Sequence, residues 1–294
     1  MRMNLHHLAI FHAIAETGSM SAAAVKLRIS QPALSRELKA FEEREGVRLF
    51  ERLPRGMRLT EPGHVLHEHA CRLFAVADAA QAAMQEFAHA RRGQLAIGAS
   101  NTIGTYVLPQ FIAGFRAAYP DIALSIFVGN TEQVARGVAD LRFNLGLVEG
   151  PLHVEGLYAQ QFRTDELIPV VASSHPLAAQ QKLQQHQLNG LPLLMREPGS
   201  GTRELILQVL QQQQIAPGEI IELGNTEAVK QAAIHAAGIA WLPRISVSRE
   251  LQDGVLRELP LAALKVERGF SFIRREGAYE TPAMAAFIQS ICAG

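Results

Sequence analysis

The stretch from Ser19 to Lys39 reads S-M-S-A-A-A-V-K-L-R-I-S-Q-P-A-L-S-R-E-L-K. Ser19 and Ser30 are good helix N-caps, and Pro32 suits a first helical turn, where no amide donor is needed. The stretch therefore predicts two short helices joined by a tight turn. The second helix would carry a polar face opposite its apolar face. This polar face is formed by Gln31, Pro32, Ser35, Arg36 and Lys39. This pattern is typical of a helix-turn-helix whose second helix enters the DNA major groove.

A basic segment, R-L-P-R-G-M-R-L-T, follows at residues 52–60. Its three arginines, Arg52, Arg55 and Arg58, surround a Pro and a Gly, which predicts a hairpin suited to phosphate or minor-groove contact. From Lys26 to Arg58 there are nine Lys or Arg against five Glu, whereas the whole chain has 28 of each sign. Local positive charge favours DNA binding, although an Ala-rich helix pair that serves only for packing stays open as the alternative.

The composition indicates a folded chain of two or three domains, with 294 residues of which 48% are hydrophobic. Cys71 and Cys292 lie far apart and form no metal-binding or redox spacing, so a reducing compartment is expected. His6, His7 and His12 have no second ligand cluster nearby, and no metal site is expected. We find neither a secretion signal nor a membrane span, and the prediction is a cytoplasmic protein.

A long helix is predicted from Thr60 to about Ala90, because Thr60 and Pro62 form a helix start. Apolar residues then recur with a period of 3.5, namely Leu66, Ala70, Leu73, Ala77, Ala80, Met84 and Phe87. Such a stripe must be buried, and a homodimer through this helix is the favoured interpretation. The alternative is one amphipathic helix that packs on its own domain.

From Gly93 onward, strand-like and helical runs alternate, which predicts a parallel α/β architecture in two halves with a cleft between them. The expected strands are residues 95–99, 122–129, 145–148, 166–172, 191–196, 220–223 and 239–242. The last helix, 282–291, would close the first half. The predicted fold class is thus α+β multidomain, with a winged helix-turn-helix at 1–60, a linker helix at 61–91 and a two-part α/β domain at 92–294. Its halves would be 92–162 plus 268–294, and 163–267.

Four strand-to-helix turns offer hydroxyl or amide side chains beside backbone N–H groups, an arrangement that can bind anions. Their residues are Ser100, Asn101 and Thr102; Asn130 and Thr131; Ser200 and Thr202; and Asn225 and Thr226. Four such turns at the carboxyl ends of strands predict a small-anion cleft, whereas plain N-capping is the alternative for any single turn. Arg196 and Arg203 would add charge or pair with a nearby Glu. Glu149 would repel an anion unless an arginine neutralised it.

We find no catalytic motif: the sequence lacks a G-x-S-x-G elbow, an H-E-x-x-H pair and a Walker loop. The chain is therefore not expected to be an enzyme or to carry a cofactor. The alternative is a cytoplasmic anion-binding protein or an anion-processing enzyme with an accessory helical N-terminus.

The motifs A-A-A-V-K-L-R-I-S-Q-P-A-L-S-R-E-L-K-A-F-E (22–42) and L-F-E-R-L-P-R-G-M-R-L-T (49–60) resemble the LysR-type transcriptional regulators. Further motifs, L-G-L-V-E-G (145–150), R-E-P-G-S-G-T-R-E (196–204) and G-N-T-E-A-V-K (224–230), are similar to the branch that regulates sulfur assimilation and the Calvin cycle. One departure is Asn144, where the family commonly has Asp.

The resemblance implies a winged helix-turn-helix, a dimerising linker helix, an effector domain of periplasmic-binding-protein type and a homotetramer on promoter DNA. It leaves contact with RNA polymerase open. It also implies an effector near Ser100, Thr102, Thr131, Thr202 and Thr226. A sulfite-like or sulfate-like oxyanion is the favoured effector, with a phosphorylated metabolite or a small carboxylate as alternatives.

Overall fold

The computed structural model describes residues 3–53, 56–88 and 93–292. The chain divides into two compact units, Met1–Gln81 and Ala82–Gly294. The division falls inside the long helix α4 (Glu61–Ala88), so this helix contributes to both units.

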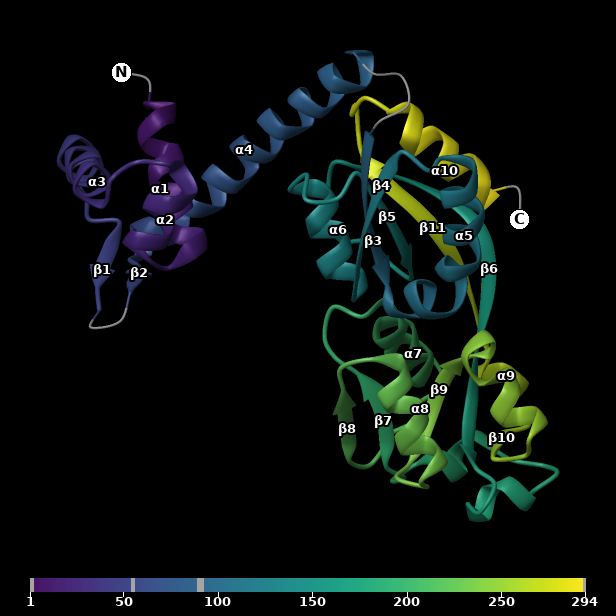
Figure 1. Cartoon of the computed structure of the whole chain (residues 1–294). Helices are drawn as coiled ribbons and strands as arrows, with labels where there is room; N and C mark the ends of the chain where they lie inside the picture. Colours follow the sequence, from purple (N-terminus) through teal and green to yellow (C-terminus); the bar gives the residue numbers. More distant parts are fainter. Residues whose placement is uncertain (1–2, 54–55, 89–92, 293–294) are drawn as a thin grey trace. The chain divides into compact units, whose positions relative to one another are not determined.

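The first unit contains the predicted helix-turn-helix. Its helices are α1 (Leu5–Thr17), α2 (Met20–Leu27) and α3 (Gln31–Glu45), followed by β1 (Phe50–Arg52), β2 (Met57–Leu59) and the start of α4 (Figure 1). Ser19 and Ser30 cap α2 and α3 as predicted, and each hydroxyl accepts a 3.4 Å bond from the N–H three residues later. Gly46 ends α3 with a φ of 73°, a left-handed conformation that suits glycine. The antiparallel pair β1–β2 forms the predicted wing.

A single apolar core holds these helices together. Leu34, Leu38 and Phe41 of α3 are buried against Phe11 and Ile14 of α1. The Glu42 carboxylate accepts hydrogen bonds from the N–H groups of Leu49 and Phe50, at 2.7 and 3.2 Å, and so fixes the chain where it enters the wing.

The apolar stripe of α4 is used in two ways. Leu66 and Ala70 pack into the core of the first unit, as in the alternative that we considered for this helix. Leu73 and Met84 further along are exposed, with 39% and 68% of their surface accessible. The side chain of Phe87 lies outside the described residues. Only the later part of the stripe is thus available to a partner.

The second unit is built on one mixed sheet. Its strands are β3 (Gly93–Ser100), β4 (Ile122–Gly129), β5 (Leu145–Glu149), β6 (Leu157–Ala172), β7 (Leu193–Arg196), β8 (Ile220–Leu223), β9 (Ile239–Pro243), β10 (Leu256–Glu258) and β11 (Val266–Arg275). The order is β4-β3-β5-β11-β6-β9-β7-β8, with β10 paired to β6. The helices are α5 (Leu108–Ala118), α6 (Thr131–Ala139), α7 (Gly201–Gln212), α8 (Thr226–Ile234), α9 (Arg244–Gln252) and α10 (Pro282–Cys292).

The predicted parallel α/β architecture is present in each half, but the sheet as a whole is mixed. The triplets β4-β3-β5 and β8-β7-β9 are parallel, but β6 and β11 between them run antiparallel to each other and to β9 and β5, respectively. Our strand predictions missed β10, β11 and the first half of β6. Residues Tyr158–Gln161 of β6 are exposed, so that half lacks the apolar run that marks a buried strand.

Each half of the second unit has its own apolar core. In the first half, α5 and α10 cover one face of β3 and β5, whereas α6 covers the other (Figure 1). Met284, Phe287 and Ile291 of α10 lie in that first core, as the predicted closing helix requires. In the second half, Trp241 and Met195 are buried in the corresponding core. Among the described residues, no helix is both long and apolar enough to cross a membrane.

Candidate functional site

The four predicted turns lie where strands of the two halves end and helices begin. Residues 100–102 join β3 to a π-helical turn at Ile103–Val107, and residues 130–131 join β4 to α6. Residues 199–202 join β7 to α7, and residues 225–227 join β8 to α8. The strand-to-helix placement of all four turns is thus confirmed.

Arg268 of β11 connects the turns of the two halves. Its Nη1 donates to Thr202 Oγ1 at 2.7 Å, and its Nη2 donates to Thr102 Oγ1 at 3.3 Å. The same guanidinium donates to Asp165 Oδ2 at 3.1 and 2.9 Å and lies 3.7 Å from Glu149 Oε1. The Arg268 side chain is 1% exposed. A buried cation thus lies between two carboxylates and two threonine hydroxyls.

Glu149 has the arginine partner that the sequence analysis required, and it shares this partner with Asp165. Arg268 supplies the opposite charge, and the Ser100 hydroxyl donates a hydrogen bond to the Glu149 carboxylate. The backbone carbonyl of Glu149 accepts a 2.9 Å bond from Thr131 Oγ1, which in turn accepts from the N–H of Gly201 at 3.3 Å. These contacts tie the end of β5 to the first turns of α6 and α7.

Gly201 permits this close approach of α7 to the end of β5. A Cβ on Gly201 would lie 2.1 Å from the Glu149 carbonyl oxygen, closer than any side chain allows. Any larger residue would therefore force α7 away from β5.

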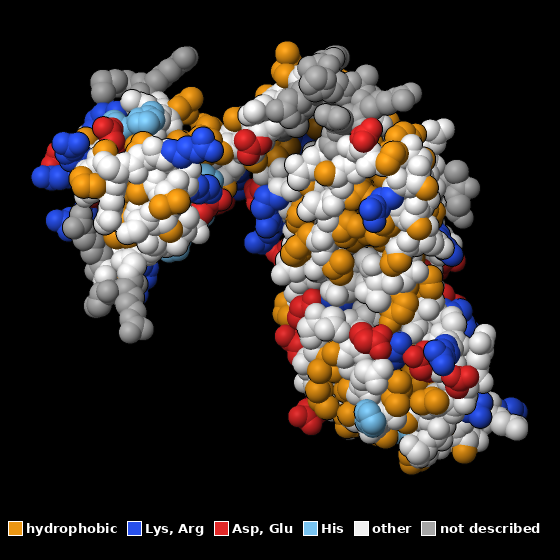
Figure 2. All heavy atoms as spheres, in the orientation of Figure 1, with side chains coloured by type: hydrophobic (Ala, Val, Ile, Leu, Met, Phe, Trp, Pro, Cys, Tyr) orange, Lys and Arg blue, Asp and Glu red, His pale blue; other side chains and the backbone are white. Residues whose placement is uncertain are grey.

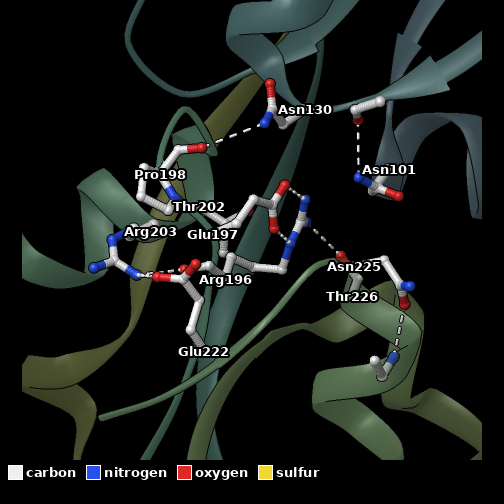
Figure 3. Close-up of polar contacts among 12 residues, drawn as sticks. Asn101, Asn130, Arg196, Glu197, Pro198, Thr202, Arg203, Glu222, Asn225 and Thr226 are labelled. Carbon is white, nitrogen blue, oxygen red and sulfur yellow. Dashed lines mark hydrogen bonds and ion pairs between the residues drawn. The ribbon is translucent and has the colours of Figure 1, made fainter. Parts of the chain in front are cut away.

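Two of the predicted residues cap their own helices. Asn130 Oδ1 accepts from the Gln133 N–H at 2.9 Å and Asn225 Oδ1 from the Ala228 N–H at 2.7 Å. Asn130 also donates to the Pro198 carbonyl at 3.3 Å, a contact between the halves that is drawn in Figure 3. Asn101 donates to the Gly129 carbonyl at 2.9 Å. Ser200, by contrast, is buried but does not cap α7 through its side chain.

The predicted arginines of the second half are already paired. Arg196 is buried and makes two 2.7 Å bonds to Glu197, as well as a 3.0 Å bond to Thr226 Oγ1 (Figure 3). Arg203 donates to the Arg196 carbonyl at 2.6 Å and to Glu222 at 3.2 Å. The sequence analysis had left such pairing open, and it reduces the charge that either arginine can offer an anion.

A second polar cluster joins the halves at Tyr106. The Tyr106 hydroxyl donates to Glu227 at 2.6 Å, and Lys230 lies 3.0 Å from Glu227 and 2.8 Å from Glu250. Burial and the hydrogen bond to Glu227 raise the pKa of Tyr106 to about 12. Burial acts to lower the pKa of Lys230, but hydrogen bonds to Glu250 and Glu227 outweigh it and raise that pKa.

Asn144 lies far from the anion-binding candidates. Its Oδ1 accepts from the Ala96 N–H at 2.8 Å, just before β5 begins, whereas Glu149 ends that strand. Five residues of extended chain span about 16 Å. Asn144 therefore ties β5 to β3 and does not alter the charge around Glu149.

The polar face of α3 is accessible. Gln31, Pro32, Arg36 and Lys39 are exposed and Ser35 is partly buried. Figure 2 shows Lys and Arg side chains gathered over α3 with acidic groups among them. Lys39 lies 3.5 Å from Glu43, and Arg58 of the wing donates to Glu51 at 2.6 Å. Arg55 and the side chain of Arg52 lie outside the described residues.

Comparison with known proteins identifies both parts of the chain. Residues 5–64 match the family of bacterial regulatory helix-turn-helix proteins of the lysR type, and residues 88–293 match the LysR substrate binding domain. The chain belongs to the LysR family of transcriptional regulators. Its relatives are regulators rather than enzymes, and the anion-processing enzyme considered above is therefore set aside.

One relative of this LysR regulator is a probable RuBisCO transcriptional regulator of Cyanidioschyzon merolae. The two are 33% identical over 293 residues, which cover 98% of this chain and 97% of the relative. That name agrees with the branch that the sequence motifs indicated.

Solved structures also resemble this LysR regulator. The regulatory domain of CcmR from Synechocystis PCC6803, in complex with 2-PG, is 26% identical with a TM-score of 0.62. The match covers 68% of this chain and 96% of that domain. Full-length CbnR complexed with its target DNA shares the fold at 22% identity, with a TM-score of 0.71 and coverage of 98% and 99%.

Two central residues of this LysR regulator were missed from the sequence, Arg268 and Asp165. A signal for Arg268 exists, because positions 268, 270 and 272 are buried in β11 with period-2 spacing. An arginine in phase with Phe270 and Phe272 points inward, and a buried arginine needs carboxylate partners.

Proposed function

We propose that this LysR regulator senses a small oxyanion between the two halves of its effector domain and thereby adjusts its binding to promoter DNA. The observation that carries the proposal is the contact of one buried guanidinium, Arg268, with Thr102 from the first half and Thr202 from the second. A ligand that replaces either contact changes the bonds between the halves.

Helix geometry supports an anion. Helix α7 begins at this contact and α6 begins beside α7, and the first N–H groups of a helix favour negative charge. The hydroxyls of Ser100, Thr131 and Ser200 add further polar groups from the same turns. Four turns of this kind from facing halves suit a ligand that accepts hydrogen bonds on several sides.

Spacing favours a small oxyanion. Arg268 is shared by Glu149 and Asp165, so the nearby side chains carry one more negative than positive charge. This excess disfavours every anion and a polyanion most, so a sulfite-like or sulfate-like group would take its bonds from hydroxyls and backbone N–H groups. Contacts such as Thr131 to Gly201 at 3.3 Å also keep the halves close together.

A phosphorylated metabolite is the second candidate. It is favoured by the 26% identical CcmR domain, which was solved with 2-PG. Both candidates are acceptor-rich anions, and direct comparison of the two will separate them.

The DNA-binding half is proposed to act as a homodimer. Gln31, Pro32, Ser35 and Arg36 would contact base edges, while Lys39, Arg52, Arg55 and Arg58 would contact phosphates or the minor groove. Three exposed apolar residues of α4, Leu73, Val76 and Met84, would contact a second copy, and two dimers would form a homotetramer on DNA in the cytoplasm.

Fluorescence anisotropy of the full-length protein on its own promoter region tests this function. We expect sulfite, sulfate or 2-PG to change the DNA affinity of the unaltered protein. Thr202→Val should keep the affinity without anion and lose the response, whereas Thr202→Ser should retain both. A full response in Thr202→Val would contradict a role for this hydroxyl in sensing.

A further inference from the structure

Three metal-ligating side chains meet inside the first unit. His12 lies on α1, and His67 and Cys71 lie on α4, where a spacing of four places them on one face of the helix. One ligand atom of each lies within 4.8 Å of those of the other two. Tertiary packing thus assembles a cluster from residues 12, 67 and 71, whereas the sequence analysis had considered His12 and Cys71 separately, had not singled out His67, and expected no metal.

The distances suit a tetrahedral ion. Cys71 Sγ lies 3.6 Å from His67 Nε2. With Zn–S near 2.3 Å and Zn–N near 2.0–2.1 Å, tetrahedral angles place a sulfur and a nitrogen ligand about 3.6 Å apart. This pair therefore has the required spacing, whereas the His12 ring, which stacks on His67, must turn to aim a nitrogen at the ion.

His12 carries a polar atom that needs a partner. Its Nδ1 is buried and has no hydrogen-bond partner among the described residues, a costly arrangement for a ring nitrogen. Its Nε2 lies 3.6 Å from Glu16 Oε2, and its ring stacks on His67 and Phe74 at centroid distances of 5.6 and 5.1 Å. Coordination through Nδ1 would satisfy that atom and leave Nε2 to donate to Glu16, as carboxylates commonly orient metal-bound histidines.

We propose that His12, His67 and Cys71 form a site for Zn²⁺ or a similar thiophilic divalent ion, with water as the fourth ligand. Two imidazoles and a thiolate are the ligands that zinc prefers, whereas Mg²⁺ and Ca²⁺ require oxygen ligands. All three residues are partly buried, so both the ion and a water molecule can reach them.

The bound ion would link α1 of the helix-turn-helix to α4. These helices otherwise meet through apolar contacts, such as those of Ala70 and Phe74 in the shared core. A coordinated ion would lock the orientation of α1 against α4 and stabilise the first unit. This role is independent of any effector in the second unit.

Titration of the reduced full-length protein with Co²⁺, followed by displacement with Zn²⁺, tests the site. We expect one Co²⁺ per chain, a thiolate-to-cobalt absorption band and visible bands of tetrahedral intensity. Cys71→Ser should abolish the thiolate band, and His67→Gln should weaken Zn²⁺ binding by more than about 100-fold, since loss of outer partners alone costs 10- to 100-fold. Zn²⁺ should also raise the unfolding temperature of the unaltered protein but not of Cys71→Ser.

Matched controls are present in the chain. His64 and His69 lie exposed on α4, and Cys292 is the second, exposed cysteine. His64→Asn, His69→Asn and Cys292→Ser should leave the stoichiometry and the spectrum unchanged. The proposal is overturned if Cys71→Ser keeps the band, if Cys292→Ser removes it, or if the folded unaltered protein gives no thiolate band. Circular dichroism establishes whether each variant is folded. If Cys71→Ser does not fold, the loss of Zn²⁺ affinity in His67→Gln tests the site instead.

Discussion

Arg268 Nη1 donates a 2.7 Å hydrogen bond to Thr202 Oγ1, and this bond joins the central strand β11 to the first turn of α7. Through Nη2 the same guanidinium reaches Thr102, in the other half of the domain. The contact between the halves thus depends on a side chain whose charge is balanced by Asp165 and Glu149. A change in the hydrogen bonds of Arg268 therefore changes the contact between the two halves of the domain.

Removal of the Arg268 charge should destabilise the effector domain strongly. Arg268→Met leaves Asp165 and Glu149 buried without their counter-ion, and breaking a buried pair in this way costs about 3–5 kcal/mol. Urea unfolding measures the loss. Arg268→Lys keeps the charge and should lose less. If Arg268→Met is as stable as the unaltered protein, the carboxylates do not depend on Arg268.

The Tyr106 hydroxyl should ionise at an unusually high pH. Its pKa is raised to about 12 by burial and by its bond to Glu227, whereas an unfolded tyrosine titrates near pH 10. Because the folded pKa is the higher one, its contribution to stability is complete below about pH 10 and is lost as the pH rises to about 12. Absorbance titration should show one late tyrosinate that Tyr106→Phe removes.

The control for this titration is Tyr119→Phe, which replaces an exposed tyrosine and should leave the late transition in place. Glu227→Gln should move the transition to lower pH, because it removes the negative charge beside the Tyr106 hydroxyl that opposes ionisation. A late transition that persists in Tyr106→Phe would assign it to another tyrosine.

Gly201→Ala should weaken the contact between the halves. The added Cβ would meet the Glu149 carbonyl oxygen at 2.1 Å, and such overpacking typically costs about 1–3 kcal/mol. Gly224→Ala is the matched control, since nothing lies within 4 Å of its Cβ position. The comparison uses thermal unfolding. Equal unfolding temperatures for the two variants would show that α7 can shift to accommodate the added Cβ without loss of stability.

Two residues of α3 should affect DNA binding differently. Arg36→Ala should cost about 1–3 kcal/mol on the specific site and relax the sequence preference. Lys39→Ala should weaken specific and random DNA alike and reduce the salt slope by about one. Anisotropy at several salt concentrations distinguishes these outcomes, and equal losses on both DNAs for both variants would contradict the division of roles.

Much of the fold could be predicted from local signals. Ser19, Ser30 and Gly46 are cap residues whose roles depend on neighbouring backbone alone, so the helix-turn-helix was predicted correctly. The first half of β6 and the whole of β11 were not, because β6 is exposed along that half and β11 pairs with strands more than 90 residues earlier. Pairing at such separation leaves no local pattern beyond the alternation of Phe270 and Phe272.

The candidate site was predicted in part for the same reason. Strand-to-helix turns are visible in the sequence, and the turns at Thr102, Thr131, Thr202 and Thr226 lie where the pattern placed them. The partners of these side chains come from elsewhere: Arg268 lies 66 residues from Thr202 and 166 from Thr102. Likewise, only the fold brings His12 to His67 and Cys71.

Thermal unfolding of the full-length protein against a panel of oxyanions tests the central proposal most directly. The panel contains sulfite, sulfate, thiosulfate, 2-PG and small carboxylates, and the comparison is with Thr202→Val. A ligand at 100 times its dissociation constant adds about 2.7 kcal/mol of stability. We predict a clear rise in unfolding temperature with one small oxyanion, which Thr202→Val loses. No rise with any anion, or an equal rise in Thr202→Val, would contradict an oxyanion site at this contact.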